Sequence, residues 1–260
     1  MTGRGNHERA ASPMREQFPG VVNGVVVRLT LRAAMNRKRA LLCALPAILL
    51  IGVSAVLKAT ATGTAWPPDV LSILGYLLLA LTALIVGGSV LGAEMDDGSI
   101  LHLLATPVSR RTIVLSKYLV AVTLTVAFVA IPLYIASAIA TGAASKLAIG
   151  LLVGALAGAV IYNAIFLMLT AVLSPGPALG IGLLYILLWE GLLASLVPGV
   201  GLLSADHYSL AIANSIAHNS ALQPNLTVGT AAVLGIVVTA VCLVLATRSL
   251  SAFSVKGDVA

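Results

Sequence analysis

The chain has 260 residues, of which 59% are hydrophobic and only 9% are charged, and its mean hydropathy is +1.06. About a quarter of the residues of a soluble domain are charged, so this composition excludes a soluble globular protein and indicates an all-α polytopic membrane protein. The 15 Lys and Arg against 9 Asp and Glu are interpreted as a signal of membrane orientation, and we expect no nucleic-acid partner.

The N-terminal part of the chain precedes the first long apolar run. Residues 1–20 are polar and lack the apolar centre of a signal peptide, so we predict a disordered cytoplasmic segment. Residues 21–39 are loosely amphipathic, with Arg28 and Arg32 one helical turn apart, which predicts an interfacial helix lying on the bilayer. Its basic end meets the lipid headgroups, where the first spanning helix begins.

Apolar runs of about 20 residues, the length needed to cross a bilayer, predict a six-helix transmembrane domain over residues 40–247. The expected spans are 40–57, 70–93, 116–140, 147–173, 178–197 and 226–246. Pro132 is expected to kink the third span. Between the spans lie a charged connection (94–115) and a segment of mixed polarity (198–224), and the chain ends in a polar tail (248–260).

The distribution of Lys and Arg predicts which side each connection occupies. The N-terminal segment holds eight of them, the region from the charged connection to Lys117 holds three, and the tail holds two. The opposite side holds only Lys58 and Lys146. Positive charge stays on the cytoplasmic side of a membrane, so we expect both termini and the charged connection in the cytoplasm, and 198–224 outside.

The charged connection has the features of a short capped helix. Asp97 suits a helix N-terminus, Ile100, Leu103 and Leu104 share one face, and Pro107 ends the segment. A helix too short to span the bilayer must bury its apolar face elsewhere. The residues alone leave open whether this face packs against the protein's own helices, lies in the membrane interface or docks on another protein.

The same connection carries a spaced pattern of residues: Glu94-x-x-x-Gly98-Ser99, then Leu103-Leu104-x-Thr106-Pro107-Val108-Ser109-Arg110, with Lys117 starting the next helix. The pattern resembles the signature of ABC transporter permeases of the type-2 (ABC-2) exporter family. It is most similar to the six-span permeases made separately from their ATPase. Ser99 is a mild departure, because Thr is commoner at this position in the family.

The resemblance implies that this connection is a coupling helix inserted into a groove of an ATPase subunit. The coupling residues it implies are Glu94, Asp97, Gly98, Ile100, Leu101, Leu104, Pro107, Ser109 and Arg110. The segment 21–39 resembles the family's connecting helix. The implied partners are two copies of an ABC ATPase and a second permease, either the same chain or a paralogue, in the cell membrane.

The chain contains no G-x-x-x-x-G-K-[ST] motif for binding nucleotide phosphates. We therefore expect no enzyme activity and no cofactor in this chain, with ATP and Mg²⁺ bound by the partner ATPase. The largely aliphatic composition favours an amphipathic drug, a lipid or a lipid-linked molecule as the exported substrate.

Several polar side chains on the predicted spans are candidates for substrate contact or gating. The resemblance implies that a central cavity is lined from the second and fifth spans, where the polar-tipped residues are Tyr76, Thr82, Tyr185 and Trp189. Glu190 is either an acid at membrane depth, which would indicate function, or an acid at the outer surface. The resemblance favours an outer gate here, with Glu190 and Pro198 at the start of short re-entrant helices.

Two alternatives to a permease remain open at this point. Glu190, Asp206, His207 and His218 would form an intramembrane enzyme site if they converged, although the two histidines fit no zinc spacing and we expect no metal. The chain would otherwise be a non-transporting membrane partner of an ATPase.

Gly150, Gly154 and Gly158 form a doubled G-x-x-x-G motif, which permits close approach of another helix. The approaching helix belongs either to a second copy or, as we favour, to the same chain.

Overall fold

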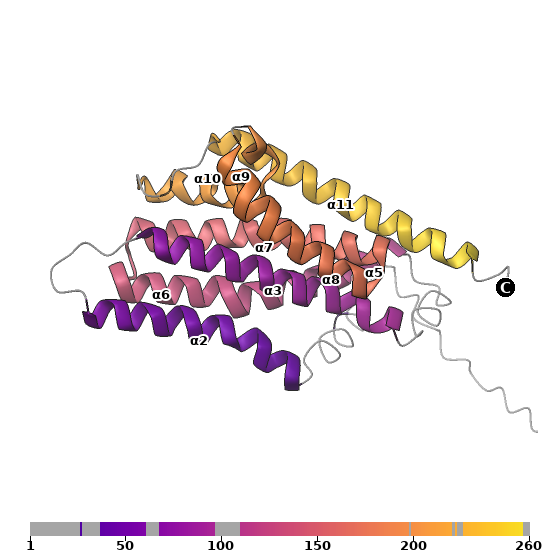
Figure 1. Ribbon diagram of the computed structural model, residues 1–260, viewed down its shortest axis with the longest axis horizontal. Coiled ribbons are helices and arrows are strands. Elements are labelled where there is room, and N and C mark those ends of the chain that lie inside the picture. The colour runs from indigo at the N-terminus through magenta and orange to yellow at the C-terminus, as the bar shows by residue number, and fades with distance from the viewer. Residues whose placement is uncertain are drawn as a thin grey trace, which may run out of the picture.

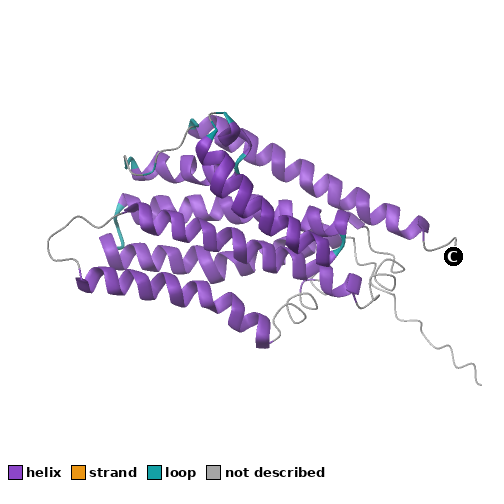
Figure 2. Ribbon diagram, in the orientation of Figure 1, coloured by secondary structure: helices purple, strands orange, loops and turns teal. Residues whose placement is uncertain are grey.

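The computed structural model describes residues 27, 37–60, 68–96, 110–197, 199–219, 222 and 226–256. These residues form helices joined by short turns, and they contain no strand (Figure 2), so the prediction of an all-α fold is confirmed. The helices are α2 (Arg37–Thr60), α3 (Pro68–Asp96), α5 (Arg110–Thr125), η1 (Val126–Ala130), α6 (Ile131–Thr141), α7 (Lys146–Leu173), α8 (Pro175–Leu184), η2 (Tyr185–Leu193), α9 (Ala194–Leu196), η3 (Val200–Leu203), α10 (Ala205–Ala217) and α11 (Val228–Lys256).

Six helical segments of the described chain are long and apolar enough to cross a membrane. They are Leu41–Ala59, Asp69–Gly92, Arg110–Thr141, Lys146–Leu173, Pro175–Leu193 and Val228–Leu250. The prediction of six spanning helices is therefore confirmed. The predicted disordered segment 1–20 lies outside the described residues, as do most of the interfacial segment 21–39 and most of the charged connection.

The long helices lie side by side, so the bundle has two ends (Figure 1). We call the end where α2 begins and α11 finishes the proximal end. At the distal end α2 finishes at Thr60, α3 begins at Pro68 and α7 begins at Lys146. Gly142, with φ of 98°, turns the chain there between α6 and α7, a backbone conformation that glycine adopts without strain.

α7 is the central helix, packing against α3, α10 and α11. α3 and α7 run in the same direction, since Tyr76 meets Gly154 and Leu79 meets Gly158 one turn further along both helices. The side chains enclosed between these helices, with Leu133, Leu151, Tyr162 and Phe166 among the most buried, form the main apolar core.

Two of the spanning segments contain π-helical turns. η1 ends two residues before Pro132, the residue expected to kink the third span, and the Ile131 N–H donates to the carbonyl of Val126 five residues earlier. Proline has no N–H to give, so a wider turn beside it lets the neighbouring amides find partners. The second π-helical stretch, η2, forms the end of the fifth span.

α10 is not one of the six spanning helices, yet it lies inside the bundle's length. It runs antiparallel to α7, because Ala217 lies at Gly150 near the start of α7, whereas Ser209 lies at Gly154 and Gly158. Its first residues therefore lie level with the middle of α7, and its last turn approaches the distal end. The chain reaches this starting point through η3 after the fifth span ends.

Candidate functional site

Glu190 of η2 joins the end of the fifth span to the start of α10. Its Oε1 accepts hydrogen bonds from the Tyr185 hydroxyl at 2.5 Å and from the Ala205 N–H at 2.9 Å. Its Oε2 accepts from the Ser204 hydroxyl. The first N–H groups of a helix have no partner within the helix and carry partial positive charge, so a carboxylate is favoured at this position.

The local sequence positions these groups. In a π-helix, residues five apart are neighbours along one face, and Tyr185 and Glu190 of η2 have this spacing. The Tyr185 ring also meets the Phe166 ring edge to face, with ring centroids 6.2 Å apart, which fixes η2 against α7. The Ser204 hydroxyl oxygen caps α10 by accepting a hydrogen bond from the His207 N–H at 3.2 Å. The same hydroxyl donates its proton to Glu190.

Two cavities adjoin at this point, and they share the lining residues Ile73, Tyr76, Asp206 and Leu210. One cavity, of about 370 Å³, extends to Asp69 in the first turn of α3. The other, of about 500 Å³, extends to Tyr162 and Glu190. Their lining residues extend from the distal end of the bundle to the level of the middle of α7.

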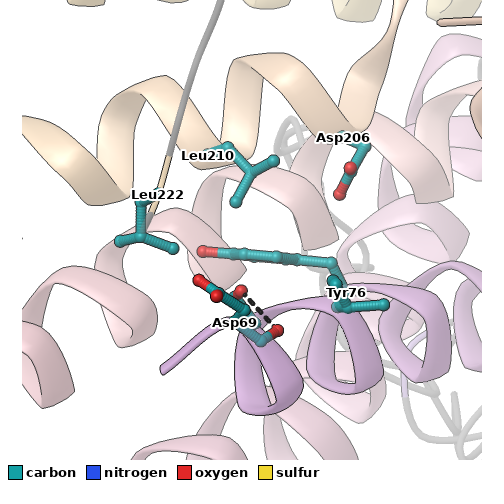
Figure 3. Close-up of a pocket in the computed structure, with 7 residues that line it drawn as sticks. Asp69, Tyr76, Asp206, Leu210 and Leu222 are labelled. Atoms are coloured by element: carbon teal, nitrogen blue, oxygen red, sulfur yellow. Dashed lines mark hydrogen bonds between the residues drawn. The ribbon is translucent and has the colours of Figure 1, made fainter. Parts of the chain in front are cut away.

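Asp206 and Tyr76 line both cavities. In Figure 3 the Tyr76 side chain extends between Asp69 and Leu210, and the Asp206 carboxylate points toward the same space from α10. Tyr76 is only 2% exposed, and its hydroxyl has no hydrogen-bond partner among the described residues. The oxygen is close to Gly154, where an added methyl group would collide with it.

The electrostatic environment of both cavities is acidic. Asp69, Asp206 and Glu190 are among the described residues that line them, and no Lys or Arg is. Burial, together with the negative charge of Glu190, raises the pKa of Asp206 to about 7. Burial lowers the pKa of His207, partly opposed by Glu190, so this imidazole is neutral at pH 7. The cavity therefore has no described cationic side chain to neutralise its carboxylates.

The residues proposed from the sequence for a substrate cavity have different surroundings. Tyr76 lines both cavities, and Tyr185 binds Glu190. Trp189 donates its indole N–H to the carbonyl of Leu203 at 3.2 Å, and Thr82 is buried inside α3. Pro198, proposed for the gate, lies outside the described residues.

The residues of the alternative enzyme site converge only in part. Glu190, Asp206 and His207 line the same cavity, but His218 caps the far end of α10. Within the described chain, no group of three or more His, Cys, Asp and Glu residues is arranged to hold a metal ion.

The glycines of the doubled motif pack within the chain, as we favoured. Gly150 and Gly154 lie against the backbone of α10, and Gly158 lies against Ser209 of α10 and Leu79 of α3. The sequence did not show that the main partner would be α10, because a helix folded back into the bundle has no signature in hydropathy.

The coupling residues lie mostly outside the described part of the chain. This applies to Asp97, Gly98, Ile100, Leu101, Leu104, Pro107 and Ser109, and also to Arg28 and Arg32 of the interfacial segment. Glu94 falls in the last turns of α3, but its side chain is not among those described, and Arg110 is the first residue of α5.

Lys117 has a role that the sequence did not reveal. We placed it at the start of the third span, but the helix begins two turns earlier, at Arg110, and Lys117 is 0% exposed. Its Nζ donates to the carbonyl of Val90 in α3 at 2.8 Å. The ammonium group therefore links the two helices that flank the charged connection. In the sequence, Lys117 lies two helical turns after Arg110, and this spacing was the feature that could have indicated that Lys117 lies deep in the bundle.

Comparison with known proteins identifies the family. Residues 35–200 match the family described as ABC-2 family transporter protein. No curated protein matches the chain significantly. The match covers more than half of the chain and includes five of the six candidate spans. Membrane components of this kind act with an ABC ATPase subunit. The chain therefore belongs to the ABC-2 family of transporter proteins, as a multi-pass membrane permease component.

Proposed function

We propose that this chain is the permease subunit of an exporter that moves an amphipathic or hydrophobic substrate across the cell membrane. Two copies of a separate ABC ATPase bind ATP and Mg²⁺, and the permease pairs with a second copy of itself or with a paralogue. The family match over residues 35–200 is the observation that supports this proposal most strongly.

The charges of the described residues support a cytoplasmic proximal end. Arg110, Arg111 and Arg248 lie toward this end, whereas Lys58 and Lys146 lie toward the distal one. With the basic N-terminal segment added, the positive-inside rule places both termini in the cytoplasm. The ATPase then docks at the proximal end, and the acidic cavities open toward the outside.

The packing of α3 offers a route from the ATPase to the cavities. α3 finishes beside the charged connection and carries Tyr76 near its other end. The Lys117 bond to Val90 makes α3 and α5 respond together to a push on that connection. A displacement of α3 along its axis moves Tyr76 relative to Asp206, and both residues line the two cavities. Such a rigid helix shift is a recognised form of switching.

The test is reconstitution of the chain with an ABC ATPase, followed by measurement of ATPase binding and of ATP-dependent export of a fluorescent amphiphile. Glu94→Lys and Arg110→Glu should each reduce export by about tenfold or more, because charge reversal at a docking surface weakens partner binding strongly. Arg111→Glu is the matched control, since it is the adjacent exposed arginine. If Glu94→Lys and Arg110→Glu retain wild-type binding and export, the coupling assignment is wrong.

The same assay separates the alternatives. A non-transporting partner would bind the ATPase without moving any substrate and without substrate-stimulated hydrolysis. An enzyme site would need Glu190, Asp206, His207 and His218 to converge, but His218 caps the far end of α10; both oxygens of Glu190 also accept hydrogen bonds already, and the His207 ring is 3.0 Å from the Ser204 hydroxyl. These contacts favour a structural role for Glu190 and His207.

A further inference from the structure

A cavity of about 400 Å³ lies between α5 and α11 near the proximal end of the bundle. Arg111 of α5 and Arg248 of α11 both line it, and both side chains are exposed. Arg111 is in the first turn of the third span and Arg248 in the last turn of the sixth, which is the level of the lipid headgroups. We call this the basic cavity, because its described lining includes two arginines and no Asp or Glu.

Leu243 lines both the basic cavity and an apolar groove of about 640 Å³ between α7 and α11. None of the described residues that line this groove is charged, and one of them, Ile236, is 71% exposed, so the groove opens on the surface of the bundle. The two helices run obliquely to each other (Figure 1). Along α11 the groove extends from Ala231 to Leu243, a length of about 18 Å. One leaflet of a bilayer has a similar depth, about half of the roughly 30 Å hydrocarbon core.

Hydrogen bonds hold the helices that carry the two arginines against α7. The Tyr118 hydroxyl of α5 donates to the carbonyl of Val160 at 2.9 Å, and Val160 also lines the groove. The Ser249 hydroxyl, next to Arg248, donates to the carbonyl of Ala171 at 2.6 Å. The helix positions that bring both arginines to one cavity are therefore fixed within the chain, which lowers the cost of binding a ligand there.

An anionic phospholipid matches both parts of this surface. Arginine binds phosphate through paired N–H donors, and basic pockets between spanning helices at the membrane surface suit anionic headgroups. A soluble phosphate would use the basic cavity and leave the groove empty. A second copy of the chain, related by a two-fold axis along the membrane normal, would bring both arginine pairs to the same level, where like charges repel.

We propose that an anionic phospholipid binds at this surface, with its phosphate between Arg111 and Arg248 and one acyl chain in the apolar groove. The lipid bridges the start of the third span and the end of the sixth. The described residues that line this site are all different from those that line the cavities beside Tyr76. The site is therefore separate from the acidic cavities, and lipid binding requires neither the ATPase nor transport.

Native mass spectrometry of the full-length chain in a mild detergent tests the headgroup. It counts the molecules bound as dioleoylphosphatidylglycerol or dioleoylphosphatidylcholine is added; these lipids share their acyl chains and differ in headgroup charge. The anionic lipid should bind about tenfold more tightly, and equal affinities would overturn the proposal. If inorganic phosphate displaced the lipid more than sodium chloride of equal ionic strength does, the ligand would be a soluble phosphate and the lipid would be rejected.

Variants of the arginines test the basic cavity. Arg111→Gln and Arg248→Gln should each weaken phosphatidylglycerol binding by about fivefold, the effect of one basic residue near an anionic lipid surface. Arg110→Gln is the matched control, since Arg110 is adjacent in sequence but does not line the cavity. Wild-type affinity for phosphatidylglycerol in the double variant would contradict the site. In ATPase docking the roles are reversed, because Arg110 is the coupling residue there and Arg111 the control, so the two proposals fail separately.

A variant of α11 tests the apolar groove. Ala240→Phe fills the groove near Leu243 and should weaken both lipids equally, because their acyl chains are the same. Val241→Phe places the same ring on an exposed position of α11 outside the groove and is the control. Wild-type binding of both lipids by the Ala240→Phe chain would show that no acyl chain lies in the groove. A lipid-free dimer that Ala240→Phe dissociates would identify a second copy as the occupant and reject the lipid.

Discussion

Two ionic side chains lie in different halves of this bundle, and each is hydrogen-bonded to the backbone of a neighbouring helix. Glu190 receives the N–H of Ala205 at the start of α10, where a helix is partially positive. Lys117 donates to the carbonyl of Val90, which lies within α3 almost two turns before that helix ends at Asp96. Glu190 thus accepts a backbone N–H in one half of the bundle, and Lys117 donates to a backbone carbonyl in the other.

The two sites differ in what surrounds them. Lys117 is 0% exposed and lies between two long spanning helices, α3 and α5. Glu190 is half-buried and borders a cavity of about 500 Å³, and it joins a π-helical turn to a helix of only 13 residues. The comparison indicates that the Lys117 site is a rigid link and the Glu190 site is a junction beside an open space.

Glu190→Ala should break the junction with the largest effect. It leaves the Tyr185 and Ser204 hydroxyls and the Ala205 N–H without their acceptor, at a cost on the order of 3 kcal/mol. Hydrogen exchange followed by mass spectrometry should show faster exchange at the start of α10, and the apparent Tm should fall. Glu190→Gln keeps one acceptor oxygen and should give an intermediate result; unchanged exchange in the Ala variant would refute the junction.

Lys117→Met should have a smaller effect on stability. Loss of the bond to the Val90 carbonyl costs about 1 to 2 kcal/mol, which is typical of a hydrogen bond to a charged group. The apparent Tm measures this loss, and Lys117→Arg should recover most of it. If Lys117 is a rigid link, the Met variant should also lower substrate-stimulated ATPase activity while α10 exchanges as in the wild type. Faster exchange in α10 would show that the two sites are not separate.

The smallest expected effect is the pH dependence contributed by Asp206. Its pKa is raised from 3.8 to about 7 in the folded chain, so the folded state binds the proton more tightly than the unfolded state does. The contribution of Asp206 to the free energy of unfolding is therefore fully present below pH 3.8 and is lost as the pH rises to about 7.

Comparing wild type with Asp206→Asn isolates this term, because the other titratable groups facing the cavities, Asp69, Tyr76, Tyr162, Glu190 and His207, are common to both chains. At pH 8 the Asn variant should have the higher apparent Tm, which corresponds to a free energy of unfolding greater by on the order of 1 kcal/mol. Near pH 4 the two chains should have equal apparent Tm values. A constant difference at all pH values would mean that Asp206 does not titrate in this range.

The six spans were predictable because hydropathy over about 20 residues reports burial in lipid directly. Glu190 was noticed for the same reason, as an acid at the edge of an apolar run. Its depth was not predictable, since that depends on where α10 folds back, and α10 has mixed composition. Asp206 lies in the segment 198–224 that we expect outside the membrane, and the sequence does not show that it lines the same cavities as Tyr76 of α3. Lys117 was placed too near the surface because the start of its helix was placed too late.

The π-helical stretch η2 also sets the rotational phase of the fifth span. Each π turn accommodates one residue more than an α turn, and one residue corresponds to a rotation of about 100° around a helix axis. Removing a single residue between Tyr185 and Glu190 would therefore turn Glu190 away from Ala205 while leaving the span nearly as long. The position of α10, and the shape of the cavity that α10 lines with η2, thus depends on the exact number of residues in η2.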